Sequence, residues 1–344
     1  MDIVVLPANQ PADRFYRGGP RIQAFRGEEP RGDRIPEDWI GSTTTIRGEA
    51  SLGLTTLPDG RILRDAIAED PERWLGREHL DAFGVDTMLL VKLLDAGQRL
   101  PVHAHPDGPF AKAHLGTGHG KAEAWFILEP GDVHLGLLRD VDADELAALV
   151  DAQDARALLA LLHRVPVRSG DTVMVPPGVL HAIGAGVLLA EVQEPEDLSI
   201  LLEWRDFELD GARDGHLGLG FDTALRAVET RGRTTDEIAA LVSGGAEGDV
   251  LARAAAPYFR FELLTVGGSD AATGTGAGAA TTTTHAGFAV LIVLDGELTL
   301  HAQGDPDAHP VRVERGTTAV LPHAAGALTV TGEGRILLAR PPRR

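Results

Sequence analysis

Short runs of apolar and β-branched residues alternate along this chain with clusters of glycine and proline. Runs of this length with turn residues between them are typical of strands in an all-β sandwich or barrel. The pattern therefore predicts a mainly β fold. The clearest expected strands are Thr87–Leu93, Trp125–Leu128, Thr172–Val175, Val187–Val192, Ala289–Leu294 and Thr318–Leu321.

Two segments have apolar residues at helical spacing instead. The longer one covers residues 142–165 behind an Asp-rich start, and the second is "TTDEIAALVSGGA", which begins with the cap-like Thr235. We expect both to be small additions to the β core, the first as a helical insertion. The apolar residues of the longer segment are Leu146, Leu149, Val150, Leu158, Leu161 and Leu162.

The chain also divides by composition. Residues 266–287 consist almost entirely of Gly, Ala, Thr and Ser, which predicts a flexible loop with strands on both sides. We place a boundary near residue 250, before "PYFRFELLTV". This boundary predicts one domain at 1–250, which carries the helical insertion around 142–165, and a second at 251–344.

Composition excludes several classes of function. The net charge of −19 and the pI near 5.0 oppose binding to nucleic acid or to an anionic membrane surface. The chain has no cysteine, so a metal would have to be bound by His, Asp, Glu or Gln. The start lacks a signal-peptide pattern, and no apolar run reaches about 20 residues. We therefore expect a cytoplasmic protein with no membrane partner.

Candidate chemistry gathers in residues 97–126, which hold four of the thirteen histidines. His103 and His105 are one residue apart, and on a strand such residues face the same side, about 6.6 Å apart at the backbone. Taken alone, this pair also fits an ordinary solvated strand edge.

Two further residues complete a ligand set. Glu123 follows in "GKAEAWFIL", and His181 lies in "GDTVMVPPGVLHAI". Together the segments match both cupin motifs, Gly-x5-His-x-His with a later Glu and Gly-x5-Pro-x-Gly-x2-His. Three imidazoles and one carboxylate suit Zn, Fe, Mn, Ni or Co. The sequence therefore predicts that His103, His105, Glu123 and His181 bind one divalent metal inside a small β-barrel.

Beyond the general cupin, the chain resembles type I phosphomannose isomerase, the zinc-dependent mannose-6-phosphate isomerase. The segments that carry the resemblance are "HAHPD" (103–107), "GKAEAW" (120–125) and "PPGVLHAIGAGVLLAEVQ" (176–193). Further out, "RFYRGGPRI" (14–22), "EDWIGS" (37–42) and "LLVKLLDAG" (89–97) are similar to the family's first strand and glycine turn, its Glu-x-Trp motif and its lysine-bearing strand.

The resemblance implies a bicupin of two jelly-roll barrels, the second degenerate, that interconverts mannose 6-phosphate and fructose 6-phosphate or acts on a related sugar. It implies zinc, although Fe, Mn or Co accept the same ligands. Glu191 falls on a proton-transfer carboxylate, and Lys92 and Lys121 fall on lysines near the substrate's phosphate. The implied catalytic residues are Glu191 and Lys121, and the implied substrate-binding residues are Lys92, Trp39 and Gln193.

Three positions depart from the family pattern. His103 stands where the family has a glutamine ligand, and Pro101 replaces a serine thought to help hold phosphate. Leu201 stands where an arginine would assist the reacting sugar oxygens. Arg205 lies four residues on, about 13 Å further along a strand, so it does not simply substitute.

These departures leave alternatives open. Pro101 and Leu201 would suit an isomerase or epimerase of an unphosphorylated sugar. His103 completes a set of three histidine ligands, which would suit an Fe(II) dioxygenase. The absence of an arginine at position 201 would suit a non-catalytic sugar-binding cupin. In every case the expected partner is a small sugar or sugar phosphate.

Overall fold

The computed structural model describes residues 3–245, 247–267 and 281–343. Strands make up 32% of the chain and helices 22%, so the predicted mainly β fold is confirmed. The strands form three sheets, and every pair among the described strands runs antiparallel. No described helix is both long and apolar enough to span a bilayer.

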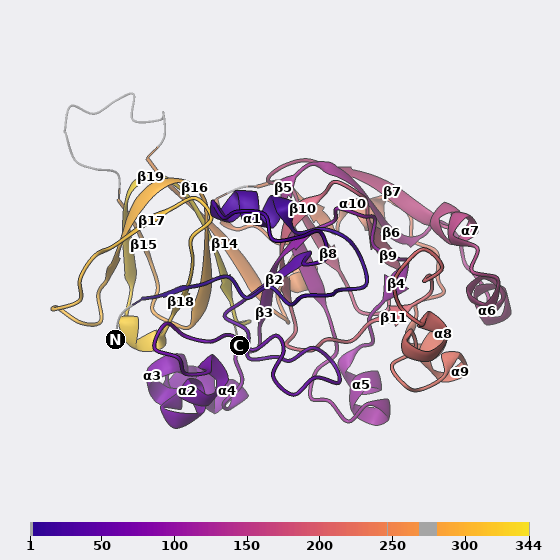
Figure 1. The fold of residues 1–344 in the computed structure, drawn as a ribbon, viewed down its shortest axis with the longest axis horizontal. Coiled ribbons are helices and arrows are strands. Elements are labelled where there is room, and N and C mark those ends of the chain that lie inside the picture. Colours follow the sequence, from indigo (N-terminus) through magenta and orange to yellow (C-terminus); the bar gives the residue numbers. More distant parts are fainter. Residues whose placement is uncertain (1–2, 246, 268–280, 344) are drawn as a thin grey trace.

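The six-stranded sheet lies in the middle of the molecule, and the five-stranded sheet lies to the right of it in this view (Figure 1). In spatial order, the six-stranded sheet consists of β12 (Val242–Ser243), β8 (Thr172–Val175), β5 (Glu123–Glu129), β10 (Leu188–Gln193), β3 (Leu90–Asp95) and β2 (Glu37–Ile40). The five-stranded sheet consists of β11 (Ile200–Leu201), β4 (His103–Ala104), β9 (His181–Ile183), β6 (Gly131–Leu137) and β7 (Leu162–Val167).

The third sheet lies at one end of the molecule and is formed mostly by the C-terminal part of the chain (Figure 1). The N-terminal strand β1 joins it by pairing with β18. The predicted division near residue 250 stays a prediction. The strands of this sheet are β1 (Val4–Leu6), β18 (Thr318–Leu321), β16 (Ala289–Ala302), β19 (Leu328–Arg340), β14 (Arg260–Val266) and β13 (Gly248–Asp249), with β15 (Thr281–Thr284) on β19 and β17 (Val311–Glu314) on β16.

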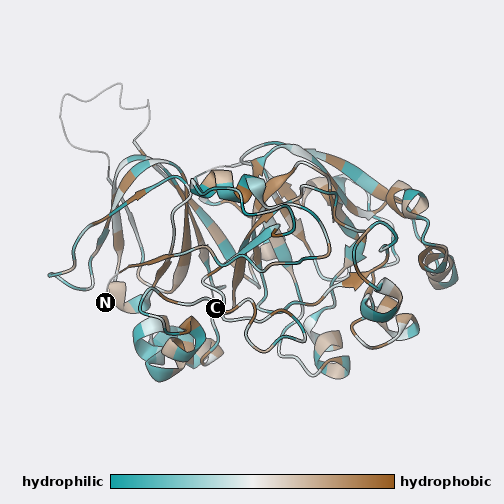
Figure 2. Cartoon of the chain, viewed as in Figure 1, coloured by the Kyte–Doolittle hydropathy of each residue, from teal (hydrophilic) through white to brown (hydrophobic). Residues whose placement is uncertain are grey.

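Short helices surround the sheets. They are α1 (Pro20–Arg26), α2 (Leu63–Glu69), α3 (Pro71–Leu75), α4 (Arg77–Phe83), α5 (Gly108–His114), α6 (Ala143–Ala152), α7 (Ala155–Ala160), α8 (Gly211–Asp214), α9 (Phe221–Ala224) and α10 (Thr235–Ala239). Three 3₁₀ turns lie at Leu225–Ala227, Arg253–Ala255 and His323–Ala325. Figure 2 shows hydrophobic residues along the central strands and hydrophilic ones on many surrounding loops.

Three details differ from the sequence prediction. The helix expected over 142–165 is two helices that end at Ala160, because Asp154 caps a new helix and residues 162–167 pair with β6 as strand β7. The cap of α10 is Thr234 rather than Thr235, with a complete capping box to Glu237. Within the expected loop 266–287, Thr281–Thr284 is strand β15, and residues 268–280 lie outside the described residues.

One buried apolar cluster connects the six-stranded sheet to the C-terminal sheet. It contains Leu93 and Leu189 from the first sheet and Val290 and Leu337 from the second. Sheet-on-sheet burial of this kind is the main stabilising term of such folds. The six-stranded sheet, which carries part of the candidate site, therefore packs against the C-terminal sheet through one continuous apolar core.

The antiparallel pair of β16 and β19 contains a glycine that the fold requires. Gly296 has a φ of +79°, and a Cβ there would collide with the carbonyl oxygen of Glu333 on the neighbouring strand. We expect Gly296→Ala to lower the free energy of unfolding by about 2 to 4 kcal/mol, through backbone strain and overpacking. Urea denaturation measures this loss.

Gly27→Ala is the matched control. Gly27 lies in the left-handed region, with a φ of +70° and a ψ of +24°, and no atom lies within 4 Å of an added Cβ. It should lose only about 1 kcal/mol from strain. Equal losses in the two variants would show that the close contact at Gly296 has no energetic effect.

Candidate active site

The register of the six-stranded sheet gathers polar side chains on one face. Lys92 on β3 lies directly opposite Trp39 on β2 and Glu191 on β10, and Glu191 lies opposite Trp125 on β5. Directly opposed residues project to the same side of a sheet. Glu123 lies two residues before Trp125, so it shares this face.

The histidines come from the five-stranded sheet. His103 on β4 pairs with His181 on β9, and on its other side it pairs with Leu201 on β11. His105 follows two residues after His103, just past the end of β4. The four predicted ligands are therefore contributed by two different sheets, with Glu123 on one and the three imidazoles on the other.

These four residues form a compact donor set. All are buried, and one candidate ligand atom from each lies within 4.8 Å of the others. In the tautomer that fits the contacts, each imidazole donates its Nδ1–H to a carbonyl oxygen, at 2.8 Å for His103, 2.6 Å for His105 and 2.9 Å for His181. This leaves the Nε2 of each imidazole as an acceptor that can bind a metal, and at His105 this acceptor contacts Lys121 Nζ at 2.8 Å.

The atom Nε2 of His181 shows the fit most directly. It is buried and accepts no hydrogen bond from the described residues, and Glu123 Oε1, itself an acceptor, lies 3.2 Å away. A buried imidazole nitrogen without a partner is costly unless something binds it. The residues present therefore fit a metal ion.

The electrostatics agree with this fit. Burial, followed by nearby positive charge, lowers the pKa of His103 well below its usual range and that of His105 to about 3, so both imidazoles are neutral. Burial raises the pKa of Glu123, but Lys121 and His105 outweigh it and hold the pKa well below normal. The Lys121 ammonium lies 2.6 Å from Glu123 Oε2 and 2.8 Å from His105 Nε2, so the donor set already attracts a cation.

A cavity of about 580 Å³ opens beside this cluster, within the usual size of a small-molecule site. Polar and charged side chains line part of it, and apolar side chains line the rest. Its polar lining includes Arg14, Tyr16, Glu37, Arg47, Lys92, His103, Lys121, Glu123, Glu191, Asp197, Ser199, Arg213 and Asp214, and its apolar lining includes Phe15, Leu94, Leu100, Pro101, Ile183, Leu201, Leu209 and Leu217.

Glu37 is the centre of a buried network in the cavity wall. Its Oε1 accepts hydrogen bonds from the Tyr16 hydroxyl at 2.7 Å and from Arg14 Nε at 3.3 Å. Its Oε2 accepts one from Trp39 Nε1 at 2.6 Å and lies 3.8 Å from Lys92 Nζ. Burial alone would raise the pKa of Glu37, but the cations and hydrogen bonds lower it to about 2.

Lys92 connects this network to Glu191. Its Nζ lies 3.5 Å from Glu191 Oε1 and 4.7 Å from the centre of the Trp39 ring. Burial and then the charge of Glu123 raise the pKa of Glu191, while Lys92 lowers it. Burial lowers the pKa of Lys92, but Glu191 and Glu37 raise it more, so the lysine is charged.

Several known proteins are similar to this chain in sequence or in fold. No family model matches the chain. GmuF of Bacillus subtilis (strain 168), named a probable mannose-6-phosphate isomerase, is 33% identical over 208 residues, which are 59% of this chain and 60% of the relative. Mannose-6-phosphate isomerase of Streptococcus mutans is 30% identical over 204 residues, 57% of this chain and 58% of the relative. The aligned region spans about three fifths of the length of each relative.

Among solved structures, the mannose 6-phosphate isomerase from Bacillus subtilis matches with a TM-score of 0.74 at 20% identity, over 99% of this chain and 100% of that one. The chain is similar to mannose-6-phosphate isomerases in sequence and in fold. The resemblance to type I phosphomannose isomerase and the cupin-type fold, both predicted from the motifs, are therefore confirmed.

Two residues assigned by that resemblance lie on the same face of the six-stranded sheet as Lys92 and Glu191 but do not line the cavity. Trp39 is fully buried beneath Lys92, and its indole donates to Glu37. Gln193 is also fully buried, and its Nε2 donates to the carbonyl oxygens of Glu194 and Glu196. Among the described residues that line the cavity, neither is present, whereas Lys92, Lys121 and Glu191 are.

The departures from the isomerase pattern do lie in the cavity. Pro101 and Leu201 both line it, and Leu201 is the cross-strand neighbour of His103. Arg205 is exposed and donates to the carbonyl oxygen of Ala152, so it does not stand in for an arginine at 201. The cavity is therefore apolar at both departures.

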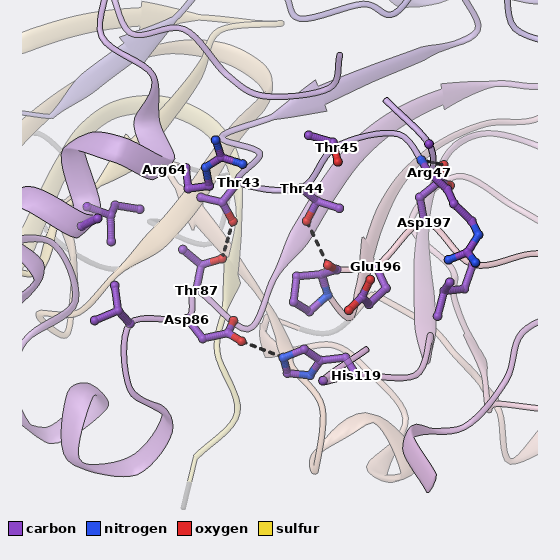
Figure 3. Close-up of a pocket in the computed structure, with 17 residues that line it drawn as sticks. Thr43, Thr44, Thr45, Arg47, Arg64, Asp86, Thr87, His119, Glu196 and Asp197 are labelled. Atoms are coloured by element: carbon purple, nitrogen blue, oxygen red, sulfur yellow. Dashed lines mark hydrogen bonds and ion pairs between the residues drawn. The ribbon is translucent and has the colours of Figure 1, made fainter. Parts of the chain in front are cut away.

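A second cavity of about 600 Å³ adjoins the first and shares Arg47 and Asp197 with it (Figure 3). In it the His119 imidazole donates to Asp86 at 2.7 Å. Hydrogen bonds to Asp86 and Glu194 raise the pKa of His119 to about 10. His119 is therefore positively charged, and among the described residues it belongs to no metal-binding group.

Sequence motifs alone gave Arg14, Tyr16 and Glu37 no role. Their segments, "RFYRGGPRI" and "EDWIGS", were matched to the isomerase pattern, but only the fold shows that their side chains meet beside Lys92. A carboxylate two residues before a tryptophan on a strand is a weak signal for such a network, because it predicts only a shared face.

We expect acid to weaken the Glu37 network. The pKa of Glu37 is lowered to about 2 in the folded state, so its stabilising effect is present above about pH 4.5 and is lost as pH falls toward 2. The difference in unfolding free energy between wild type and Glu37→Gln should therefore shrink by about 2 kcal/mol between pH 6 and pH 3. Urea denaturation at both pH values measures it, and a constant difference would contradict the assignment.

We expect the four-residue cluster to bind one divalent ion per chain. His105→Ala removes one imidazole, and Glu123→Gln removes the carboxylate charge. Each should therefore lower the metal content, measured by mass spectrometry after reconstitution and dialysis, to well below one ion per chain. His114→Ala, at an exposed histidine outside the cluster, should keep it. Undiminished stoichiometry in His105→Ala would refute the site.

Proposed function

We propose that this protein is a metal-dependent aldose–ketose isomerase that interconverts mannose 6-phosphate and fructose 6-phosphate or acts on a closely related sugar. The observation that carries the proposal is the buried pair of Glu191 and Lys92, which lies in one cavity with the donor set of three histidines and Glu123. The similarity to mannose-6-phosphate isomerases supports the choice of reaction.

The metal is the first part of the proposal. The ligands would be His103, His105, Glu123 and His181. We propose zinc on the basis of the family resemblance, although Fe, Mn and Co accept the same ligands. When bound, a divalent ion supplies Lewis-acid polarisation of a sugar carbonyl oxygen. Neutral imidazoles suit this role because they add no charge to the site.

Glu191 is the proposed proton-transfer group. In the aldose-to-ketose direction its carboxylate takes the proton from C2, the freed electron pair forms the C1–C2 double bond, and the C1 carbonyl π pair moves to O1 to give a cis-enediolate. The O2 proton then moves to O1, the electron pair left on O2 forms the C2 carbonyl, and the C1–C2 π pair takes the proton back from the Glu191 carboxyl group at C1. Burial that raises the pKa of Glu191 makes it a stronger base than an exposed glutamate.

Two lysines assist in this scheme. Lys92 lies 3.5 Å from Glu191 and would fix the position of its carboxylate, and Lys121 would donate to a reacting oxygen beside the ligand cluster. Trp39 would act beneath Lys92 by holding the ammonium over its ring. Gln193 would fix the chain after β10. We also propose a cytoplasmic protein whose partner is the sugar substrate.

A second candidate is an isomerase of an unphosphorylated sugar. The observation that favours it is the apolar surface that Pro101 and Leu201 present to the cavity. Proline has no hydroxyl group or N–H to offer, and leucine offers no charge, so neither residue binds a phosphate. Turnover of mannose, measured beside that of mannose 6-phosphate, separates the two candidates.

We expect Glu191→Gln to abolish isomerisation. The amide keeps the shape but cannot accept the C2 proton, so kcat should fall by about 10²- to 10⁴-fold with little change in metal content. Conversion of mannose 6-phosphate to fructose 6-phosphate by metal-loaded protein measures it. Glu129→Gln, at an exposed glutamate on β5, should retain turnover. Full activity of Glu191→Gln would exclude the proton-transfer role.

A further inference from the structure

Five cationic side chains line the main cavity, and three of them have a carboxylate counter-ion. A fourth, Arg47, is exposed, and its Nη2 donates to the carbonyl oxygen of Leu217 at 3.2 Å. Lys121 contacts Glu123 at 2.6 Å, and Lys92 lies between Glu191 and Glu37. At the mouth, Arg213 pairs with Asp214 and is 74% exposed. The lysines that the sequence resemblance places near a phosphate are therefore occupied by carboxylates.

Arg14 differs from these cations. Its side chain is only 14% exposed and lines the cavity, and it touches Glu37 through Nε alone, at 3.3 Å. Neither terminal guanidinium nitrogen makes a hydrogen bond to any residue that the structure describes. Glu37 Oε1 also accepts from Tyr16, so this carboxylate is shared.

The position of Arg14 is fixed on several sides. Its backbone N–H donates to Arg34 O at 3.2 Å, and Arg34 Nη2 donates to Arg14 O at 2.9 Å. Its guanidinium carbon lies 5.9 Å from the centre of the Phe15 ring. These contacts fix the backbone, and the hydrogen bond from Nε to Glu37 holds the guanidinium itself, so it loses little freedom when it binds a ligand.

We propose that Arg14 binds the phosphate of the sugar and thereby makes the cavity selective for a phosphorylated substrate. This inference rests on the proposed isomerase function and adds the residue that recognises the anionic end. Two free terminal nitrogens on one planar group match two phosphate oxygens in a bidentate contact.

The arrangement of contacts supports this orientation. Glu191 to Lys92, Lys92 to Glu37 and Glu37 to Arg14 are successive contacts of 3.5, 3.8 and 3.3 Å along one wall. A sugar whose C2 lies at Glu191 would extend its far end along this wall toward Arg14. Pro101 and Leu201 offer no donor for an anion, so the charged end is directed away from them.

The test compares mannose 6-phosphate with mannose. In Arg14→Met, kcat/KM for mannose 6-phosphate should fall by about 10²-fold, because a partly buried charge pair is lost, while kcat/KM for mannose changes less than about 3-fold. Arg14→Lys restores the charge without the bidentate geometry and should fall by only about 10-fold. Melting temperatures establish that both variants are folded.

Arg213→Met is the matched control, since it removes an arginine from the mouth of the same cavity. It should change kcat/KM for either sugar by less than about 3-fold, because its charge is exposed and screened. Equal losses for both sugars in Arg14→Met, or no loss for either, would overturn the proposal.

Calorimetry separates this inference from the proposed function. Wild-type protein loaded with metal should bind mannose 6-phosphate at least about 10-fold more tightly than mannose, and Arg14→Met should lose this preference. If wild type turns over neither sugar but shows this pattern, the isomerase assignment fails and the role of Arg14 stands. Equal binding of the two sugars by wild type would overturn the role of Arg14 whatever the turnover.

Discussion

One buried carboxylate, Glu37, organises the polar side of the cavity. Its two oxygens receive a hydroxyl, an indole N–H and a guanidinium, and lie beside an ammonium, so four side chains are fixed by one group. An isolated carboxylate would be costly here, but one with this many partners remains ionised. Through Lys92 the same charge fixes Glu191. The geometry of the proposed chemistry therefore depends on Glu37, which does no chemistry itself.

The ligand cluster adds a second constraint, because it joins two sheets. Glu123 comes from the six-stranded sheet, and the histidines come from the five-stranded sheet. An ion bound by both would tie the sheets together in addition to the apolar core. Binding of metal to the folded state alone would also stabilise the fold by mass action. Folding and metal binding are therefore expected to be coupled.

The cavity has a charged wall and an apolar wall. The charged wall runs from the ligand cluster through Glu191 and Lys92 to Arg14, and the apolar wall includes Pro101 and Leu201. Where the chain departs from the isomerase pattern it loses donors on one side, and Arg14 supplies free donors on the other. The proposed specificity thus follows from the two terminal nitrogens of Arg14, which make no hydrogen bond to any described residue.

Short-range patterns in the sequence predicted the main strands and a shared face for His103 and His105, because residues two apart on a strand share a face. The match to the cupin motifs added Glu123 and His181 to the ligand set, and the longer quoted segments carried the family resemblance. The same patterns extended a helix into β7, because apolar spacing alone does not show that sheet pairing will override it. Only the tertiary structure placed Arg14 beside Glu37 and Leu201 beside His103. These contacts join segments far apart in the chain, and strand register, which local spacing does not encode, decides which side chains meet.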